Sequence, residues 1–285
     1  MELKSEFENK VVIVTGAGRG LGRSHAIEFA RRGAKVCVND LGGAVDGTGT
    51  GNTAQAVVDE IKQMGGTAIA STADVSDYRA AKSIIDDTLN AFGSIHIVIN
   101  NAGILRDKTF RNLTMENFLA VLNVHLMGAV HVTRASWPVL CDQGWGRVVF
   151  TSSGSGIFGN FGQSNYAAAK MGLIGLMNVL KLEGIKKGIR INCLAPGAIT
   201  RMTENIPNLT RGTPEQVSPA VLYLSSENAP NGIILQASGG RFSIIDIGVS
   251  QGVELGETVS YENFIENADQ LLKDRVFFPG QPLVP

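Results

Sequence analysis

The sequence predicts an α/β fold with a doubly wound parallel sheet, and three features of the chain carry that prediction. Short apolar runs alternate with amphipathic stretches along most of the chain. A glycine-rich turn directly follows the first apolar run. The stretches between the runs have the length and apolar period of helices, which are the crossovers that parallel strands need. We therefore expect one sheet covered by helices on both faces, in the Rossmann-like manner.

Seven apolar runs have the length of buried strands. They are Val11–Thr15, Lys35–Asp40, Thr67–Ala73, Ile95–Asn100, Arg147–Ser152, Ile189–Leu194 and Ile233–Ala237. Helical patterns separate these runs. One follows the glycine-rich turn and stops at Gly33, and the others cover residues 52–64, 77–92, 114–140, 165–187 and 214–224. Glycine is a common residue just past a helix end, which is why Gly33 marks a boundary.

The regular alternation fades after about Gly248. We expect a single domain over residues 1–250, followed by a C-terminal extension over residues 251–285 to which the sequence assigns no role. No internal repeat of short fixed period and no linker rich in proline or serine interrupts the domain.

Composition and charge narrow the class of protein. The formal net charge is −1, so nothing favours nucleic acid or an anionic membrane surface as a partner. The three cysteines, Cys37, Cys141 and Cys193, are far apart, which argues against a disulfide framework or a metal site. The polar N-terminus and the lack of an uninterrupted apolar run of membrane-spanning length predict a cytoplasmic protein with no membrane partner.

The first turn, TGAGRGLG at residues 15–22, predicts a dinucleotide site. Its backbone N–H groups and the positive end of the following helix would face a pyrophosphate. Gly16, Gly20 and Gly22 would permit the turn, the close approach and the helix packing, and Arg19 and Leu21 lie among them. A glycine-rich loop alone often merely turns the chain, but a position between the first strand and first helix favours nucleotide binding.

Asp40 ends the second strand, where a carboxylate binds the ribose hydroxyls of NAD and repels the extra phosphate of NADP. Arg19 would instead favour NADP, because a cation could pair with that phosphate. The sequence therefore favours NAD. The ends of the next two strands supply further candidate contacts, for which a helix cap or a plain turn is the alternative: Asp74, Val75, Asn101, Ala102 and Gly103.

Tyr166 and Lys170 are four residues apart on a predicted helix and so share a face. Ser153 follows the fifth strand. A tyrosine phenol has a pKa near 10, and a neighbouring ammonium favours its phenolate, which is a base for proton transfer. A Y-x-x-x-K pattern alone is common, but here it lies beside a dinucleotide fold.

At these motifs the chain resembles the short-chain dehydrogenase/reductase family over about residues 5–250. The matches are TGAGRGLG, NNAG at 100–103, Asn123 in NVHLMG, SSGSG at 152–156, YAAAK at 166–170 and PG at 196–197. The resemblance implies a catalytic tetrad of Asn123, Ser153, Tyr166 and Lys170. It implies that Tyr166 is the acid/base and that Lys170 lowers its pKa and binds the nicotinamide ribose. It also implies that Pro196, Gly197 and Ile199 border the nicotinamide, and that the protein forms a homodimer or homotetramer through the helices at 114–140 and 164–187.

A narrower resemblance is to the (3R)-hydroxyacyl-CoA dehydrogenases of peroxisomal multifunctional enzymes. It rests on the glycine-rich loop after Asp40, on NNAGILRDKTF, on GNFGQSNYAAAKMGL and on TRMT at 200–203. It implies oxidation of a (3R)-3-hydroxyacyl-CoA thioester with NAD, with any enoyl-CoA hydratase as a separate protein. The stretch PGAIT and the chain after residue 241 depart from the pattern.

Three alternatives stay open. The substrate could be a hydroxysteroid or another alcohol or ketone, the chain could bind a dinucleotide without catalysis, or its main task could be to dock a hydratase. Arg106, Lys108 and Arg111, which follow the NNAG motif, could meet the phosphates of coenzyme A or could be solvated loop charges.

Overall fold

The computed structural model describes residues 5–199, 212–273 and 277–279. The TRMT stretch lies outside them. The chain forms two compact units, residues 1–244 and 245–285. The boundary at residue 250 that the sequence suggests remains a prediction.

The larger unit is built on a sheet of eight strands in the order β3-β2-β1-β4-β5-β6-β7-β8. The strands from β3 to β7 are all parallel to their neighbours. Their bounds are β1 (Val11–Thr15), β2 (Lys35–Asn39), β3 (Thr67–Ser71), β4 (Ile97–Asn100), β5 (Gly146–Thr151), β6 (Ile189–Gly197), β7 (Ile234–Ser238) and β8 (Arg241–Ile245). A two-residue turn of left-handed glycines, Gly239 and Gly240, connects β7 to β8, and only antiparallel neighbours can be joined so tightly.

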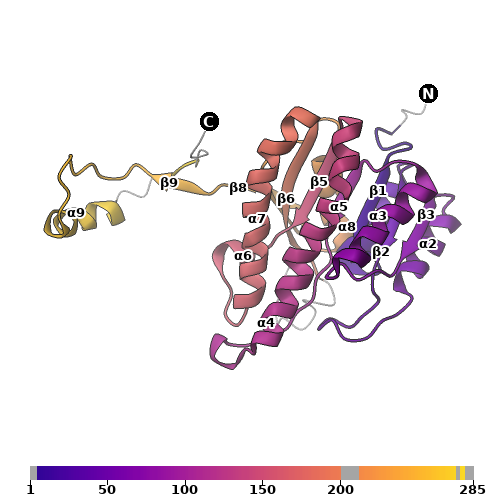
Figure 1. Ribbon diagram of the computed structural model, residues 1–285, viewed down its shortest axis with the longest axis horizontal. Coiled ribbons are helices and arrows are strands. Elements are labelled where there is room, and N and C mark those ends of the chain that lie inside the picture. The colour runs from indigo at the N-terminus through magenta and orange to yellow at the C-terminus, as the bar shows by residue number, and fades with distance from the viewer. Residues whose placement is uncertain (1–4, 200–211, 274–276, 280–285) are drawn as a thin grey trace. The chain divides into compact units, whose positions relative to one another are not determined.

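Helices cover both faces of this sheet (Figure 1). Their bounds are α1 (Gly20–Ala30), α2 (Thr53–Gln63), α3 (Tyr78–Phe92), α4 (Met115–Leu122), α5 (Gly128–Gln143), α6 (Gly154–Phe158), α7 (Ser164–Gly184) and α8 (Pro214–Ser225). In Figure 1, α3, α5 and α7 lie in front of the sheet and α8 lies behind it, where it packs on α1. The doubly wound α/β prediction is confirmed, because each parallel crossover is a helix.

Three details of the sheet and helices differ from the sequence prediction. The sixth strand continues to Gly197, and β8 was not expected. The helix predicted over residues 114–140 contains a π-helical turn, η2 (Asn123–Met127), between α4 and α5. Such turns widen the helix locally and are frequent at functional sites.

By length and composition, the helix Met115–Gln143 could cross a membrane. Core helices of soluble proteins pass the same test. Here the helix buries Val132, Thr133 and Ser136, and it packs on β4 and β5. We therefore assign it to the layer of helices on the sheet.

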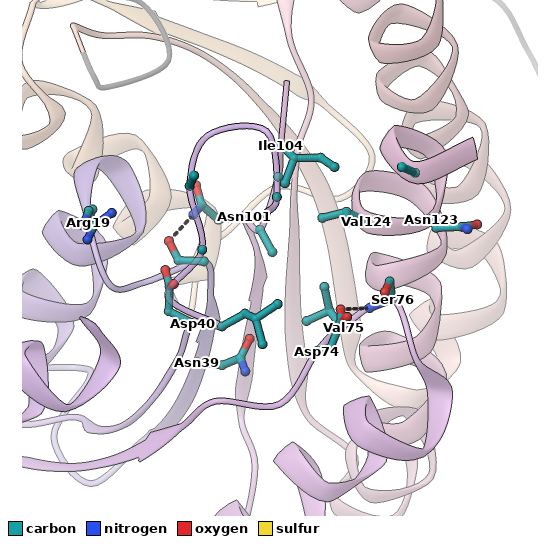
Figure 2. Close-up of a pocket in the computed structure, with 18 of the residues that line it drawn as sticks. Arg19, Asn39, Asp40, Asp74, Val75, Ser76, Asn101, Ile104, Asn123 and Val124 are labelled. Atoms are coloured by element: carbon teal, nitrogen blue, oxygen red, sulfur yellow. Dashed lines mark hydrogen bonds between the residues drawn. The ribbon is translucent and has the colours of Figure 1, made fainter. Parts of the chain in front are cut away.

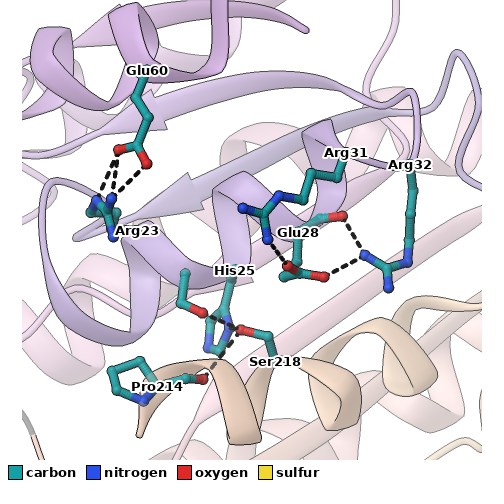
Figure 3. Close-up of polar contacts among 9 residues, drawn as sticks. Arg23, His25, Glu28, Arg31, Arg32, Glu60, Pro214 and Ser218 are labelled. Carbon is teal, nitrogen blue, oxygen red and sulfur yellow. Dashed lines mark hydrogen bonds and ion pairs between the residues drawn. The ribbon is translucent and has the colours of Figure 1, made fainter. Parts of the chain in front are cut away.

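The helix that follows the glycine-rich turn is held by polar contacts on two sides (Figure 3). Arg23 of α1 forms an ion pair with Glu60 of α2, at 2.6 Å. On the other side, Nδ1 of the buried His25 lies 2.8 Å from Ser218 Oγ of α8, and Ser24 Oγ lies 2.7 Å from the same atom. Burial lowers the pKa of His25 to about 3, so this imidazole is neutral in the folded protein.

The smaller unit contains a short antiparallel pair, β9 (Gly248–Ser250) with β10 (Phe277–Pro279), and the helix α9 (Tyr261–Lys273). The sequence made no prediction for these elements.

Candidate active site

The glycine-rich turn wraps against the end of β4. Gly16 has a positive φ of 61°, and a Cβ there would lie 2.6 Å from Ala102 Cα, so only glycine fits. Asn101 Nδ2 donates to the carbonyl oxygens of Thr15 and Gly16, both at 3.0 Å. The turn and the NNAG motif therefore form one rigid surface.

A cavity of about 440 Å³ opens at this surface (Figure 2). Of the residues predicted to bind cofactor or act in catalysis, those that line it are Gly16, Arg19, Gly20, Leu21, Asp40, Asp74, Val75, Asn101, Ala102, Gly103 and Asn123. Figure 2 shows Arg19 and Asp40 on one side of the cavity and Asn123 and Val124 on the other. The carboxyl ends of neighbouring parallel strands converge here, which is where such folds bind ligands.

Gly22 does not line the cavity. A Cβ there would lie 2.3 Å from Gly16 O, so this glycine serves the close packing of α1 on the turn. Gly20, at the start of α1, has a positive φ of 54°.

The carboxylate of Asp40 is fixed by three donors. Gly18 N donates to Oδ2 at 2.8 Å, and Gly42 N and Thr53 Oγ1 donate to Oδ1 at 2.7 and 3.1 Å. Arg19 is exposed and does not pair with Asp40. Neither Gly18 nor Thr53 was predicted as a contact of Asp40. In the case of Thr53, only the fold brings residue 53 back to residue 40.

The end of β3 forms another wall. Asp74 Oδ1 accepts a hydrogen bond from Ser76 N at 2.8 Å, so the carboxylate caps a local turn. Val75 is buried, and a Cβ on Gly128 would lie 2.8 Å from it. Asp74 was offered as a possible helix cap, but the residue that caps α3 is Asp77, whose side chain accepts from Ala80 N.

Ser153 lies just past the end of β5, whereas Tyr166 and Lys170 lie four residues apart on α7. Ser153 directly follows Ser152 at the end of β5, and its Oγ accepts from Ser155 N at 3.1 Å. The buried Lys170 donates from Nζ to the carbonyl of Thr151, and Nζ lies 5.5 Å from the centre of the Tyr166 ring. Burial lowers the pKa of Lys170 to about 7. This ammonium therefore titrates in the neutral range, beside the phenol.

Asn123 lies at the first position of η2, and its carbonyl accepts from Gly128 N, the five-residue step of a π-turn. Its side chain is exposed and lies at the cavity. Pro196 and Gly197 end β6, and Ile199 N donates to Gly212 O. These last three residues do not line the cavity formed by the described residues.

His125 was not predicted as a site residue. Its Nε2 lies within 3.0 Å of both the N and the O of Ile104. Its ring meets the Tyr166 ring edge to face at 5.0 Å, and it occupies the space of any side chain at Gly103. Burial, with the nearby Lys170 charge, holds the pKa of His125 well below its usual range. Its position two residues after Asn123 was the available signal.

Within the described part of the chain, no three His, Cys, Asp or Glu side chains group together in a way that could hold a metal ion.

The profile of the short chain dehydrogenase family matches residues 10–210 of the chain. The chain is a short-chain dehydrogenase/reductase. It is 48% identical over 261 residues to a short-chain type dehydrogenase/reductase of Mycobacterium tuberculosis, covering 90% of this chain and 91% of that one. It is 46% identical to the peroxisomal hydratase-dehydrogenase-epimerase of Saccharomyces cerevisiae, covering 82% of this chain but only 26% of that enzyme.

The structure is similar to the crystal structure of a short chain dehydrogenase from Mycobacterium avium. The TM-score is 0.83 at 37% identity, covering 98% of both chains. This short-chain dehydrogenase/reductase is therefore an oxidoreductase, and its family generally uses NAD or NADP.

Proposed function

We propose that this enzyme oxidises (3R)-3-hydroxyacyl-CoA thioesters to 3-ketoacyl-CoA with NAD. The observation that carries the substrate class is the 46% identity to a yeast peroxisomal hydratase-dehydrogenase-epimerase over 82% of the chain. The wider family supports only an oxidoreductase. The site geometry supports chemistry at a secondary alcohol, because the buried Lys170 lies beside the Tyr166 phenol and His125 connects Tyr166 to Gly103 and Ile104 of the cavity wall.

Each side chain has a proposed role. Tyr166 removes the proton from the substrate hydroxyl, while Ser153 binds that oxygen. Lys170, in its charged form, stabilises the Tyr166 phenolate. Asn123 anchors water near Lys170. A dinucleotide held in this cavity would supply the acceptor for the hydride of the carbinol carbon.

The residues around the cavity fit a dinucleotide, and they favour NAD. Gly16 and Gly20, both with positive φ, shape the turn that lines the cavity, where a pyrophosphate would approach the backbone closely. The three donors that hold Asp40 keep a carboxylate at the end of β2, where it would repel a ribose phosphate. Pro196, Gly197 and Ile199 remain proposed nicotinamide contacts.

The remaining proposals follow from the resemblance to the family. We propose a cytoplasmic homodimer or homotetramer that uses the helices at 114–140 and 164–187, and a separate enoyl-CoA hydratase that supplies its substrate. A hydroxysteroid or another alcohol is the alternative substrate class. A purely binding or docking role is disfavoured, since all four proposed catalytic residues are present.

The test is a substrate panel assayed by the appearance of NADH. It contains both epimers of several 3-hydroxyacyl-CoA chain lengths and a few free hydroxysteroids. We expect the (3R) thioesters to have the highest kcat/KM, because the Ser153–Tyr166 pair fixes the hydroxyl and binding energy from the coenzyme A handle assists reaction at the carbinol. Preference for (3S) thioesters, or for a steroid over every thioester, would falsify the substrate assignment.

A further inference from the structure

The loop between β2 and α2, residues 41–52, folds back on itself. Gly51 N donates to Leu41 O at 3.0 Å, and Ala44 N donates to Thr48 O at 2.8 Å. Gly42 has a φ of 84°, and a Cβ there would lie 2.4 Å from Gly51 N. Glycine is required at this point, because the two ends of the loop touch. The glycine-rich composition therefore builds a closed loop of defined shape.

This β2–α2 loop lies against the segment after the NNAG motif. Leu105 N donates to Val45 O at 2.9 Å, and a Cβ on Gly47 would lie 3.0 Å from the Ile104 side chain. Leu41, Gly43, Ala44 and Gly47 line the cofactor cavity beside Asp40. The loop is therefore the wall of the cavity at the end where Asp40 would meet the adenosine ribose.

Arg106 joins this wall to two helices. Its Nε donates to Asp46 O at 2.8 Å, and its Nη1 donates to Asn117 Oδ1 of α4 at 3.0 Å. Its own carbonyl accepts from the buried Asn165 at 3.1 Å, and Asn165 Oδ1 accepts from Tyr166 N at 2.8 Å. The guanidinium thus reaches the loop from a backbone position fixed at the start of α7.

These contacts differ from those of a cation held ready for a phosphate. Both acceptors are neutral amide or peptide oxygens, and the Nε and Nη1 groups of the Arg106 guanidinium are already occupied. Lys108 and Arg111, the other two cations of this segment, are exposed.

We propose that Arg106 is a positioning residue that fastens the β2–α2 loop over the adenosine end of the cavity and so determines how tightly the dinucleotide is retained. The inference rests on the proposed binding of a dinucleotide in this cavity. It assigns Arg106 to the cofactor side of the site, in place of the two alternatives left open by the sequence, a contact to coenzyme A phosphates or a solvated loop charge.

The test measures binding of NAD, ADP-ribose and nicotinamide mononucleotide by calorimetry to the wild-type protein, Arg106→Ala and Arg106→Lys. Arg106→Ala should weaken NAD and ADP-ribose by the same factor, about tenfold or more, because a charged hydrogen bond to the wall is lost. Affinity for the mononucleotide, which lacks adenosine, should not change. Arg106→Lys should behave like Arg106→Ala, since one ammonium cannot replace a planar fork that spans two acceptors.

Arg241→Ala is the matched control, because Arg241 is an exposed cation on β8 at the other edge of the sheet, and it should bind all three ligands like the wild type. Endoproteinase cleavage before Asp46 gives a second readout that needs no turnover. ADP-ribose should protect this bond in the wild type and much less in Arg106→Ala.

The outcomes separate the two proposals. A wild-type protein that binds neither NAD nor ADP-ribose overturns the dinucleotide site itself. If both Arg106 variants bind ADP-ribose with wild-type affinity, only the proposed role of Arg106 in positioning the β2–α2 loop is overturned. A rise in KM for the thioester with unchanged ADP-ribose affinity would instead return Arg106 to the coenzyme A phosphates.

Discussion

At the scale of single residues, the site depends on one buried cation beside one phenol. Lys170 is held by the carbonyl of Thr151 under the Tyr166 ring, and burial lowers its pKa to about 7. His125 also packs on the Tyr166 ring, edge to face, and its lowered pKa makes it a neutral group. The charge near Tyr166 therefore comes from Lys170. Substitutions of Tyr166 and of Lys170 should have different effects on catalysis and cofactor binding.

Tyr166→Phe should lower kcat by about a hundred- to ten-thousand-fold, because it keeps the ring and removes the group that transfers the proton. Affinity for NAD should change little. Lys170→Ala should lower both kcat and the affinity for NAD, since Lys170 is proposed to bind the cofactor ribose as well. Steady-state kinetics and cofactor titration check these values, and wild-type turnover in Tyr166→Phe would show that the base is another group.

At the scale of elements, the end of β2 is proposed to select the cofactor. Asp40→Ala should narrow the ratio of kcat/KM for NAD to that for NADP, because it removes a carboxylate from the place of the ribose phosphate. Kinetics with both cofactors measure the ratio, and Thr53→Ser is the control that keeps a hydroxyl donor to Asp40. If the wild type favours NADP, Arg19 rather than Asp40 governs the choice.

At the scale of the whole molecule, stability should depend on the buried imidazole between α1 and α8. The pKa of His25 is about 3 in the folded protein, against about 6.5 when unfolded. Between these values the unfolded chain binds the extra proton. The free energy of unfolding should therefore fall as the pH falls below about 6.5, by up to about 1.4 kcal/mol per pH unit from this group, and the loss should end near pH 3.

Urea denaturation at pH 7.5 and pH 5.5 tests this expectation. The wild type should lose about 1.4 kcal/mol more between the two pH values than His25→Asn does, because asparagine does not titrate. Other groups titrate in both proteins and cancel in the comparison. Equal losses in the two proteins would contradict the assignment of this pH dependence to His25.

The order of elements was readable from the sequence because it depends on local patterns. Apolar runs set the parallel strands, and amphipathic periods set the crossovers. The turn between the first strand and α1 indicated a dinucleotide site, and the tyrosine–lysine spacing placed two side chains on one helix face. The family and the enzyme class are confirmed. The roles of the individual site residues stay predictions.

The contacts between distant segments were decided only by the tertiary structure. The sequence could not indicate that Thr53 returns to Asp40, that His125 packs on Tyr166, or that Arg106 reaches the loop after β2. Each of these depends on which strand ends lie side by side, and no local period records that. The π-turn at Asn123 was hidden for the same reason, because its apolar pattern matches an ordinary α-helix. Local periodicity thus determined the scaffold, whereas the packing of loops at the ends of the strands determined the wall of the site.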